Sequence, residues 1–97
     1  MCGRFVSASL PGEIADYFSA ASVAKTRTEA NYNVAPSVNV PVIVRSDDLR
    51  QLDLMRWGLI PFWAKSASIG NKMINARSET VTEKAAFRNA AKKYRCI

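Results

Sequence analysis

The fold is decided by residues 42–57, which read VIVRSDDLRQLDLMRW. The β-branched run Val42-Ile43-Val44 is typical of a strand, and the pair Asp47-Asp48 is typical of a tight turn. The segment Gln51–Trp57 then has the composition of a strand that returns beside the first. The stretch therefore predicts a β-hairpin around which the remaining elements are arranged.

Upstream of the hairpin, Phe5-Val6-Ser7 predicts a short strand, and Pro11 followed by Gly12 predicts the start of a helix. The apolar face of that helix would hold Ile14, Tyr17 and Phe18, which follow i, i+3, i+4 spacing. Residues 22–33 are polar and are expected to be irregular. Pro36 and Pro41 bracket residues 37–40 and exclude a central strand there.

Downstream, Lys72–Asn75 predicts another short strand. A second helix is predicted by a capping box, Thr80 with Glu83, and by an apolar stripe of Phe87, Ala90, Ala91 and Tyr94. Residues 94–97 then enter an apolar strand, so we expect an incomplete sheet. Together the elements predict an α+β fold with a curved antiparallel or mixed β-sheet and two helices.

The composition excludes several kinds of site. The 97 residues suffice for one domain, and 48% of them are hydrophobic, enough for a folded core. The sequence contains no histidine, which excludes Ser-His-Asp and Cys-His catalysis within these residues. Two cysteines, Cys2 and Cys96, cannot form a four-cysteine zinc cage. We therefore expect neither a metal nor a cofactor.

The sequence also predicts a compartment. The first residues lack a basic segment followed by a long apolar stretch, and no apolar run approaches the roughly 20 residues that cross a bilayer. We expect a cytoplasmic protein without a membrane partner, associated with the nucleoid if bacterial. Thiols stay reduced in that compartment, so a Cys2–Cys96 disulfide is not expected.

Charge is unevenly distributed along the chain. Its formal net charge is +6, but residues 1–48 carry −1 and residues 49–97 carry +7. A basic half suits a polyanion such as nucleic acid, because Lys and Arg displace the counterions of phosphates. A solvated basic surface that only maintains solubility is the alternative interpretation.

Cys2 has distinctive chemistry if Met1 is removed. A free N-terminal cysteine carries an amine and a thiol on adjacent carbons, and both are partly nucleophilic near neutral pH. With an aldehyde, the amine forms an imine and the thiolate closes a five-membered thiazolidine ring. The alternative is that Cys2 serves only as a small hydrophobic residue before a strand.

Four blocks of sequence resemble one family. They are Met1-Cys2-Gly3-Arg4-Phe5, residues 31–37 (NYNVAPS), residues 56–65 (RWGLIPFWAK) and residues 74–80 (INARSET). In this order they resemble the SOS response-associated peptidase (SRAP) family, nearly end to end. The resemblance implies that residues 1–97 are the N-terminal part of a single SRAP-like domain.

The resemblance further implies an abasic-site sensor that forms a thiazolidine crosslink with single-stranded DNA. Cys2 would be the nucleophile, and Asn75 would orient its amine and the sugar. The expected DNA-binding residues are Arg4, Arg77, Asn33, Pro36, Ser37 and Trp63, and less clearly Trp57. Competing interpretations make the arginines surface ion-pair partners, Asn75 a turn residue, Trp57 a core residue, and Glu79 a partner of Arg77.

The sequence departs from the family pattern in two respects. Val38 stands where the family usually has glutamine, and residues 1–97 lack the family's downstream glutamate and histidine. Loss of such acid–base groups slows catalysis by about 10²–10⁴-fold. Because the sheet is expected to be incomplete, we expect a second chain or an oligomer to complete the fold. The class of enzyme stays open: a crosslinking or lyase-type protein, a self-processing cysteine peptidase, or a catalytically impaired DNA-binding fragment.

Overall fold

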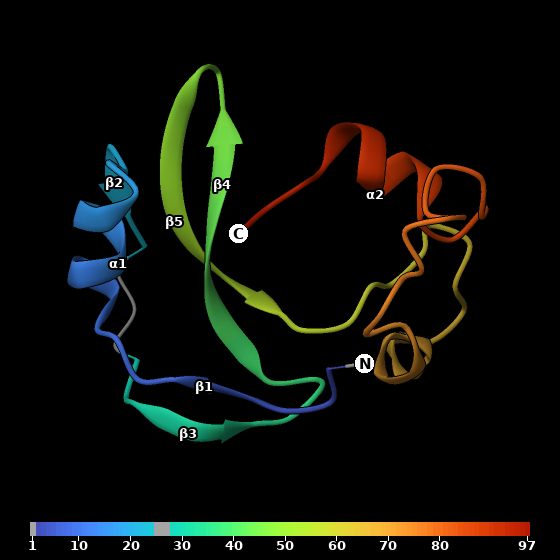
Figure 1. Cartoon of the computed structure of the whole chain (residues 1–97), viewed down its shortest axis with the longest axis horizontal. Coiled ribbons are helices and arrows are strands. Elements are labelled where there is room, and N and C mark those ends of the chain that lie inside the picture. The colour runs from blue at the N-terminus through green and yellow to red at the C-terminus, as the bar shows by residue number, and fades with distance from the viewer. Residues whose placement is uncertain (1, 25–27) are drawn as a thin grey trace.

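A computed structural model describes residues 2–24 and 28–97 of the chain (Figure 1). The elements, in chain order, are β1 (Phe5–Ser7), α1 (Pro11–Tyr17), β2 (Ser22–Val23), β3 (Asn31–Val34), β4 (Asn39–Ser46), β5 (Leu49–Arg56), the 3₁₀ helix η1 (Ala67–Lys72) and α2 (Arg88–Lys93). This is a mixed α+β fold with two small, open sheets. The predicted fold class is confirmed.

The predicted hairpin forms the centre of the molecule. β4 and β5 pair antiparallel in continuous register from Asn39↔Arg56 to Ser46↔Leu49. Asp47 and Asp48 have φ values of 48° and 65°, the left-handed conformation that both central residues of a type I′ turn adopt. This turn matches the right-handed twist of the strands, and Figure 1 shows the hairpin as a long, curved ribbon.

Two further strand pairings flank the hairpin. β2 pairs parallel with β5, which gives the three-stranded order β2-β5-β4. β1 and β3 form a separate antiparallel pair with the partners Phe5↔Val34. β4 is thus an edge strand within its sheet, and Pro41 is tolerated there because its missing N–H interrupts no central ladder. This confirms the prediction drawn from the two prolines.

The hydrophobic core lies between α1 and the hairpin. Ala15, Ile43 and Leu52 are buried together, with Ile14 and Phe18 packed against them. Tyr17 is 83% exposed instead of facing this core. The centroids of the Tyr17 and Phe18 rings are 5.0 Å apart in an edge-on arrangement. α1 ends at Tyr17, and Phe18 packs against the core.

The prediction of an irregular segment at residues 22–33 was wrong at its two ends, where β2 and the first part of β3 lie. Residues 24 and 28–30 are irregular as predicted, and residues 25–27 lie outside the described residues. Backbone pairing with neighbouring strands stabilises these polar segments. Ala21 N donates to Arg50 O at 2.7 Å, and Ala24 N donates to Leu52 O at 2.9 Å. Such hydrogen bonds leave no hydrophobic signature in the sequence.

Two predictions in the second half of the chain also needed correction. Residues 72–75 do not form a strand, since η1 extends to Lys72 and Met73 N bonds back to Gly70 O. The second helix starts at Arg88 rather than near Thr80, because residues 78–87 form successive turns. Phe87, Ala90 and Ala91 are partly buried, whereas Tyr94 is 69% exposed, so the expected apolar stripe is only partly a buried face.

The last residue aligns with the free edge of β4. Ile97 and Ile43 exchange both backbone hydrogen bonds, at 2.6 Å and 3.1 Å. This reciprocal pattern is that of one pair in an antiparallel ladder, although residues 94–97 do not form a strand. In the part of the chain that the structure describes, no helix has the length and apolarity to cross a membrane.

Gly58 fixes the path of the chain beyond β5. Its φ is +128°, and a Cβ placed there would overlap the carbonyl oxygen of Gly70 and lie 2.9 Å from its carbonyl carbon. Only glycine combines this backbone conformation with so close an approach. The contact holds η1 against the end of β5, which matters because Asn75 follows η1.

We expect Gly58→Ala to destabilise the protein by about 2 kcal/mol or more, through backbone strain and overlap with Gly70. For a domain of this size, that lowers the midpoint of thermal unfolding by about 10 °C. Gly12→Ala is the matched control, because nothing lies within 4 Å of a Cβ at Gly12. Equal midpoints for the two variants would contradict the role assigned to Gly58.

Candidate functional site around Cys2 and Asn75

Cys2 and Asn75, 73 positions apart in the sequence, meet through two hydrogen bonds. The backbone nitrogen of Cys2 donates to Asn75 Oδ1 at 3.3 Å. In return, Asn75 Nδ2 donates to the Cys2 carbonyl oxygen at 2.8 Å. The Asn75 amide therefore contacts Cys2 as acceptor and donor at once. This nitrogen is an amide while Met1 is attached, and it becomes the α-amine when Met1 is removed.

The thiol of Cys2 lies on the surface next to this contact. Its Sγ is 3.5 Å from the carbonyl oxygen of Arg4, a weak hydrogen bond that positions the side chain. Cys2 is exposed and not in a disulfide, as is Cys96. The Cys2 side chain is thus accessible to a reactant from solvent.

The strand that follows Cys2 is anchored by an aromatic contact. Phe5 in β1 pairs with Val34, and its ring meets Trp57 edge-on, with centroids 5.0 Å apart. Trp57 directly follows β5 and is half-buried. This packing favours the interpretation of Trp57 as a structural residue.

Asn75 is anchored from the same end of β5. Leu59 N donates to Met73 O at 3.0 Å, two residues before Asn75. The guanidinium of Arg56 donates to Asn71 Oδ1 at 2.9 Å, and Gly58 contacts Gly70. Both halves of the site therefore depend on the segment 56–59. Figure 1 shows the blue segment that leads into β1 running toward η1, in agreement with these contacts.

A turn after β3 brings two other predicted residues toward this region. Pro36 and Ser37 form the centre of a turn in which Val38 N approaches Ala35 O at 3.4 Å, and Ser37 has a φ of 76°. Proline followed by a positive φ is the pattern of a type II turn. Ser37 N donates to Trp57 O at 2.9 Å, so this turn is also fixed to the end of β5. The antiparallel pairing Phe5↔Val34 directs residues 35–37 back along residues 2–4.

The remaining candidates are exposed and lie outside the contact between Cys2 and Asn75. The side chains of Arg4 and Arg77 form no ion pair with a described residue, and Arg77 does not pair with Glu79. Asn33 is exposed, and its backbone N–H bonds to Asn31 Oδ1. Trp63 is 48% exposed. Their roles in DNA binding stay predictions.

The residues that position the site were largely missed by sequence reasoning. The sequence shows Gly58 only as part of the block of residues 56–65, and its contact with Gly70 was not predicted. The available signal was a glycine directly after a strand, which often marks a close backbone approach. As for metals, the described residues contain no group of three or more His, Cys, Asp or Glu side chains that could hold an ion.

Fold and site together define an α+β protein with an accessible N-terminal-region cysteine held by an asparagine amide. The sequence model of the SOS response associated peptidase (SRAP) family matches residues 1–97. The chain belongs to this family.

Several characterised proteins and solved structures are similar to the chain. "Abasic site processing protein YoaM" of Bacillus subtilis is 48% identical over 100% of this chain and 43% of its own length. "Abasic site processing protein HMCES" of Xenopus tropicalis is 35% identical over 71% of this chain. A crystal structure of a Bacteroides thetaiotaomicron protein superposes on this chain with a TM-score of 0.80 at 28% identity. The match covers 99% of this chain and 44% of the Bacteroides chain. The chain spans less than half the length of the Bacillus relative.

We expect Asn75→Ala to loosen the segment before β1, because it removes both hydrogen bonds to Cys2. A loss of about 1 kcal/mol corresponds to roughly fivefold faster amide exchange over residues 3–5, measured by NMR. Exchange in β4 and β5 should stay unchanged. Asn89→Ala is the control, since Asn89 is exposed and its side chain bonds to no described residue. Uniformly faster exchange in all strands would show a general loss of stability instead.

Proposed function

We propose that this protein processes abasic sites in DNA, and that Cys2 captures the ring-opened sugar of the lesion in single-stranded DNA. The contact of Asn75 with the nitrogen and carbonyl of Cys2 carries the proposal. The names of relatives such as YoaM and HMCES support abasic DNA as the substrate. The covalent step is our inference from the chemistry of Cys2.

The proposed reaction needs no oxidant or cofactor. After removal of Met1, the α-amine of Cys2 adds to the aldehyde carbon of the opened sugar and water leaves, which gives an imine. The Cys2 sulfur then attacks the imine carbon, while the thiol proton passes to the nitrogen. A thiazolidine ring results, which links the strand covalently to the protein. Ring closure is intramolecular and is therefore strongly favoured over bimolecular addition.

Asn75 fits the role of a positioning residue for this reaction. Its Oδ1 accepts a hydrogen bond from the Cys2 nitrogen, and its Nδ2 holds the Cys2 carbonyl. An acceptor beside the amine orients the lone pair outward, toward the thiol side that solvent reaches. An amide does this without a charge of its own, so it neither protonates the amine nor repels the phosphates of DNA.

Exposed arginines would hold the strand on either side of the lesion. Arg4 lies two residues after Cys2, and Arg77 lies two residues after Asn75. Because neither side chain is paired with a described carboxylate, their guanidinium groups are available for bidentate contacts with phosphate oxygens. Trp63 offers an exposed ring on which a neighbouring base can stack.

We expect Cys2→Ala to abolish a heat-stable crosslink to a single-stranded oligonucleotide with one abasic site. The variant should still bind the strand in a salt-sensitive manner, because its phosphate contacts are unaffected. Cys96→Ala is the matched control, since Cys96 is the second exposed free cysteine. Denaturing gel electrophoresis detects the crosslink, and intact-mass measurement confirms removal of Met1 and loss of one water.

Other results would select a different function. A crosslink that persists in Cys2→Ala contradicts the assigned nucleophile. An extra residue that blocks exposure of the Cys2 amine should also prevent the crosslink. Release of peptides from a casein substrate would favour a peptidase, and salt-sensitive binding without a crosslink in the unsubstituted protein would favour a DNA-binding module.

We expect Arg77→Ala to weaken binding to all strand sequences equally, because phosphate contacts carry no base information. The slope of log K against log salt should fall by about 0.7, the value for one phosphate contact in a single strand. Arg45→Ala is the control, because Arg45 already bonds to Asp48 at 2.6 Å. Fluorescence anisotropy with oligonucleotides of several sequences measures the affinity and the salt slope. A loss of affinity limited to one sequence would argue against this role of Arg77.

A further inference from the structure

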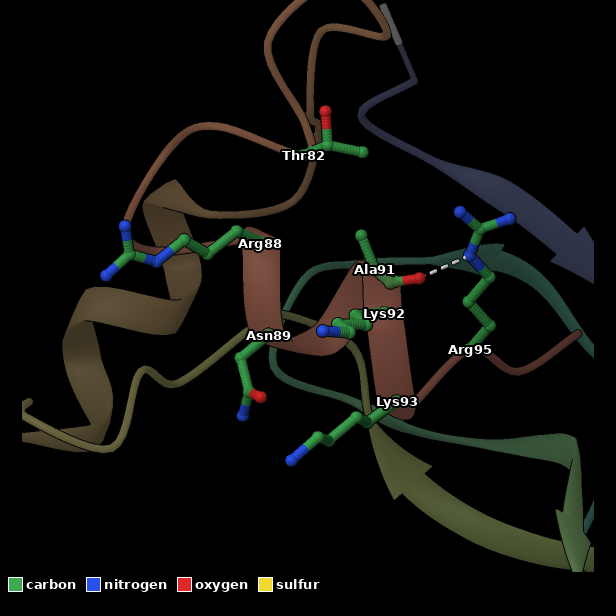
Figure 2. Close-up of a pocket in the computed structure, with 7 residues that line it drawn as sticks. All are labelled: Thr82, Arg88, Asn89, Ala91, Lys92, Lys93 and Arg95. Atoms are coloured by element: carbon green, nitrogen blue, oxygen red, sulfur yellow. Dashed lines mark hydrogen bonds between the residues drawn. The ribbon is translucent and has the colours of Figure 1, made fainter.

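The α2 region contains a hollow lined by basic side chains that the proposed reaction does not use. It has a volume of about 700 Å³ and is lined by Thr82, Arg88, Asn89, Ala91, Lys92, Lys93 and Arg95. Four of these residues are cationic and none is acidic. Figure 2 shows their side chains around α2. All of the lining residues except Ala91 are exposed, so the hollow is open to a large ligand.

The placement of these charges is unfavourable for the helix itself. Arg88 and Lys92 are four residues apart, and like charges at this spacing destabilise a helix by about 0.2–0.5 kcal/mol. Arg88 also lies in the first turn, which has no acidic residue, although a helix favours negative charge there. Stabilisation of the helix explains lysines in its last turn but does not explain Arg88. An external anion would neutralise the charges of Arg88, Lys92 and Lys93.

Arg95 is held in place at the edge of the hollow. Its Nε donates to Ala91 O at 2.6 Å, the bond drawn in Figure 2. Its two terminal nitrogens form no hydrogen bond with a described residue, so they are available to a ligand. A guanidinium fixed in this way presents its remaining donors at little entropic cost, which suits a phosphate.

The charges are spread around α2 instead of converging on one point. In Figure 2 the nitrogen-bearing ends of Arg88, Lys93 and Arg95 extend in different directions. A single phosphate ion requires convergent donors, whereas a polymer with repeated phosphates can meet separated ones in turn. We propose that the hollow around α2 is a second contact surface for a nucleic-acid strand, which binds its phosphates independently of the lesion.

This inference rests on the proposed DNA-binding function but not on its covalent step. The test therefore uses intact single-stranded DNA and the Cys2→Ala background, where no crosslink forms. The variant Lys92→Ala/Lys93→Ala removes two lining charges and spares Arg95, whose bond to Ala91 is structural. Lys65→Ala/Lys72→Ala removes the same charge outside the hollow and serves as the control.

The salt slope should fall by about 1.4 in the lining variant, for two single-strand phosphate contacts. The factor by which its affinity falls between about 50 and 200 mM salt is then about sevenfold smaller than the factor for the parent. Equal slopes in the lining variant and the parent, or an equal loss in the control variant, would overturn the proposal. Crosslinking by the protein with Cys2 intact is measured separately. An unchanged salt slope, which would contradict the α2 surface, is therefore distinguishable from the absence of a crosslink, which would contradict the capture reaction.

A second measurement does not depend on folding of a variant. Amine acetylation read by mass spectrometry should show Lys92 and Lys93 protected by the oligonucleotide, and Lys65 and Lys72 less so. Inorganic phosphate at equal ionic strength should give no comparable protection. Protection by phosphate alone would indicate a site for a small anion, and stronger protection by polyglutamate would indicate an acidic protein partner; either result contradicts a nucleic-acid surface.

Discussion

The close approach of Gly58 to Gly70 is the constraint on which the candidate site depends. It lets the chain leave β5 with η1 packed against its own backbone, and the bond from Leu59 to Met73 follows from it. Trp57, one residue earlier, contacts Phe5 in β1. One short segment therefore determines where both Cys2 and Asn75 lie. A reactive residue near a chain terminus is otherwise poorly ordered unless it is tied to the fold.

This arrangement explains how an exposed site can still be selective. Cys2 is not buried, and its chemistry needs no low-dielectric pocket, because an aminothiol reacts with an aldehyde through groups it already carries. The fold contributes orientation, through the Asn75 amide, and access, through the open surface. In the proposed capture reaction, selectivity for damaged DNA would follow from the aldehyde itself, which an intact deoxyribose in a strand does not present.

The sequence predicted the parts of the structure that have strong local signals. The β-branched run, the Asp47-Asp48 turn and Pro11 gave the hairpin and α1 correctly, and the motif blocks placed Asn75 beside Cys2. The strands β2 and β3 were missed because backbone pairing with neighbours holds them, and Asn31 or Ser22 shows no strand preference. The predicted helix over residues 80–94 was too long, because residues 78–87 form turns and only Arg88–Lys93 is helical.

Within the proposed function, capture and strand binding place different demands on the same surface. Capture requires a nucleophilic amine at Cys2, and strand binding requires cations for the phosphates. One basic surface would serve both purposes, because the cations that bind the strand would also bring the aldehyde to Cys2. The uneven charge of the chain fits this arrangement. Cys2, the proposed nucleophile, belongs to the half with a net charge of −1, and the fold brings it to Asn75 in the half with +7. The two functions meet only in the folded protein.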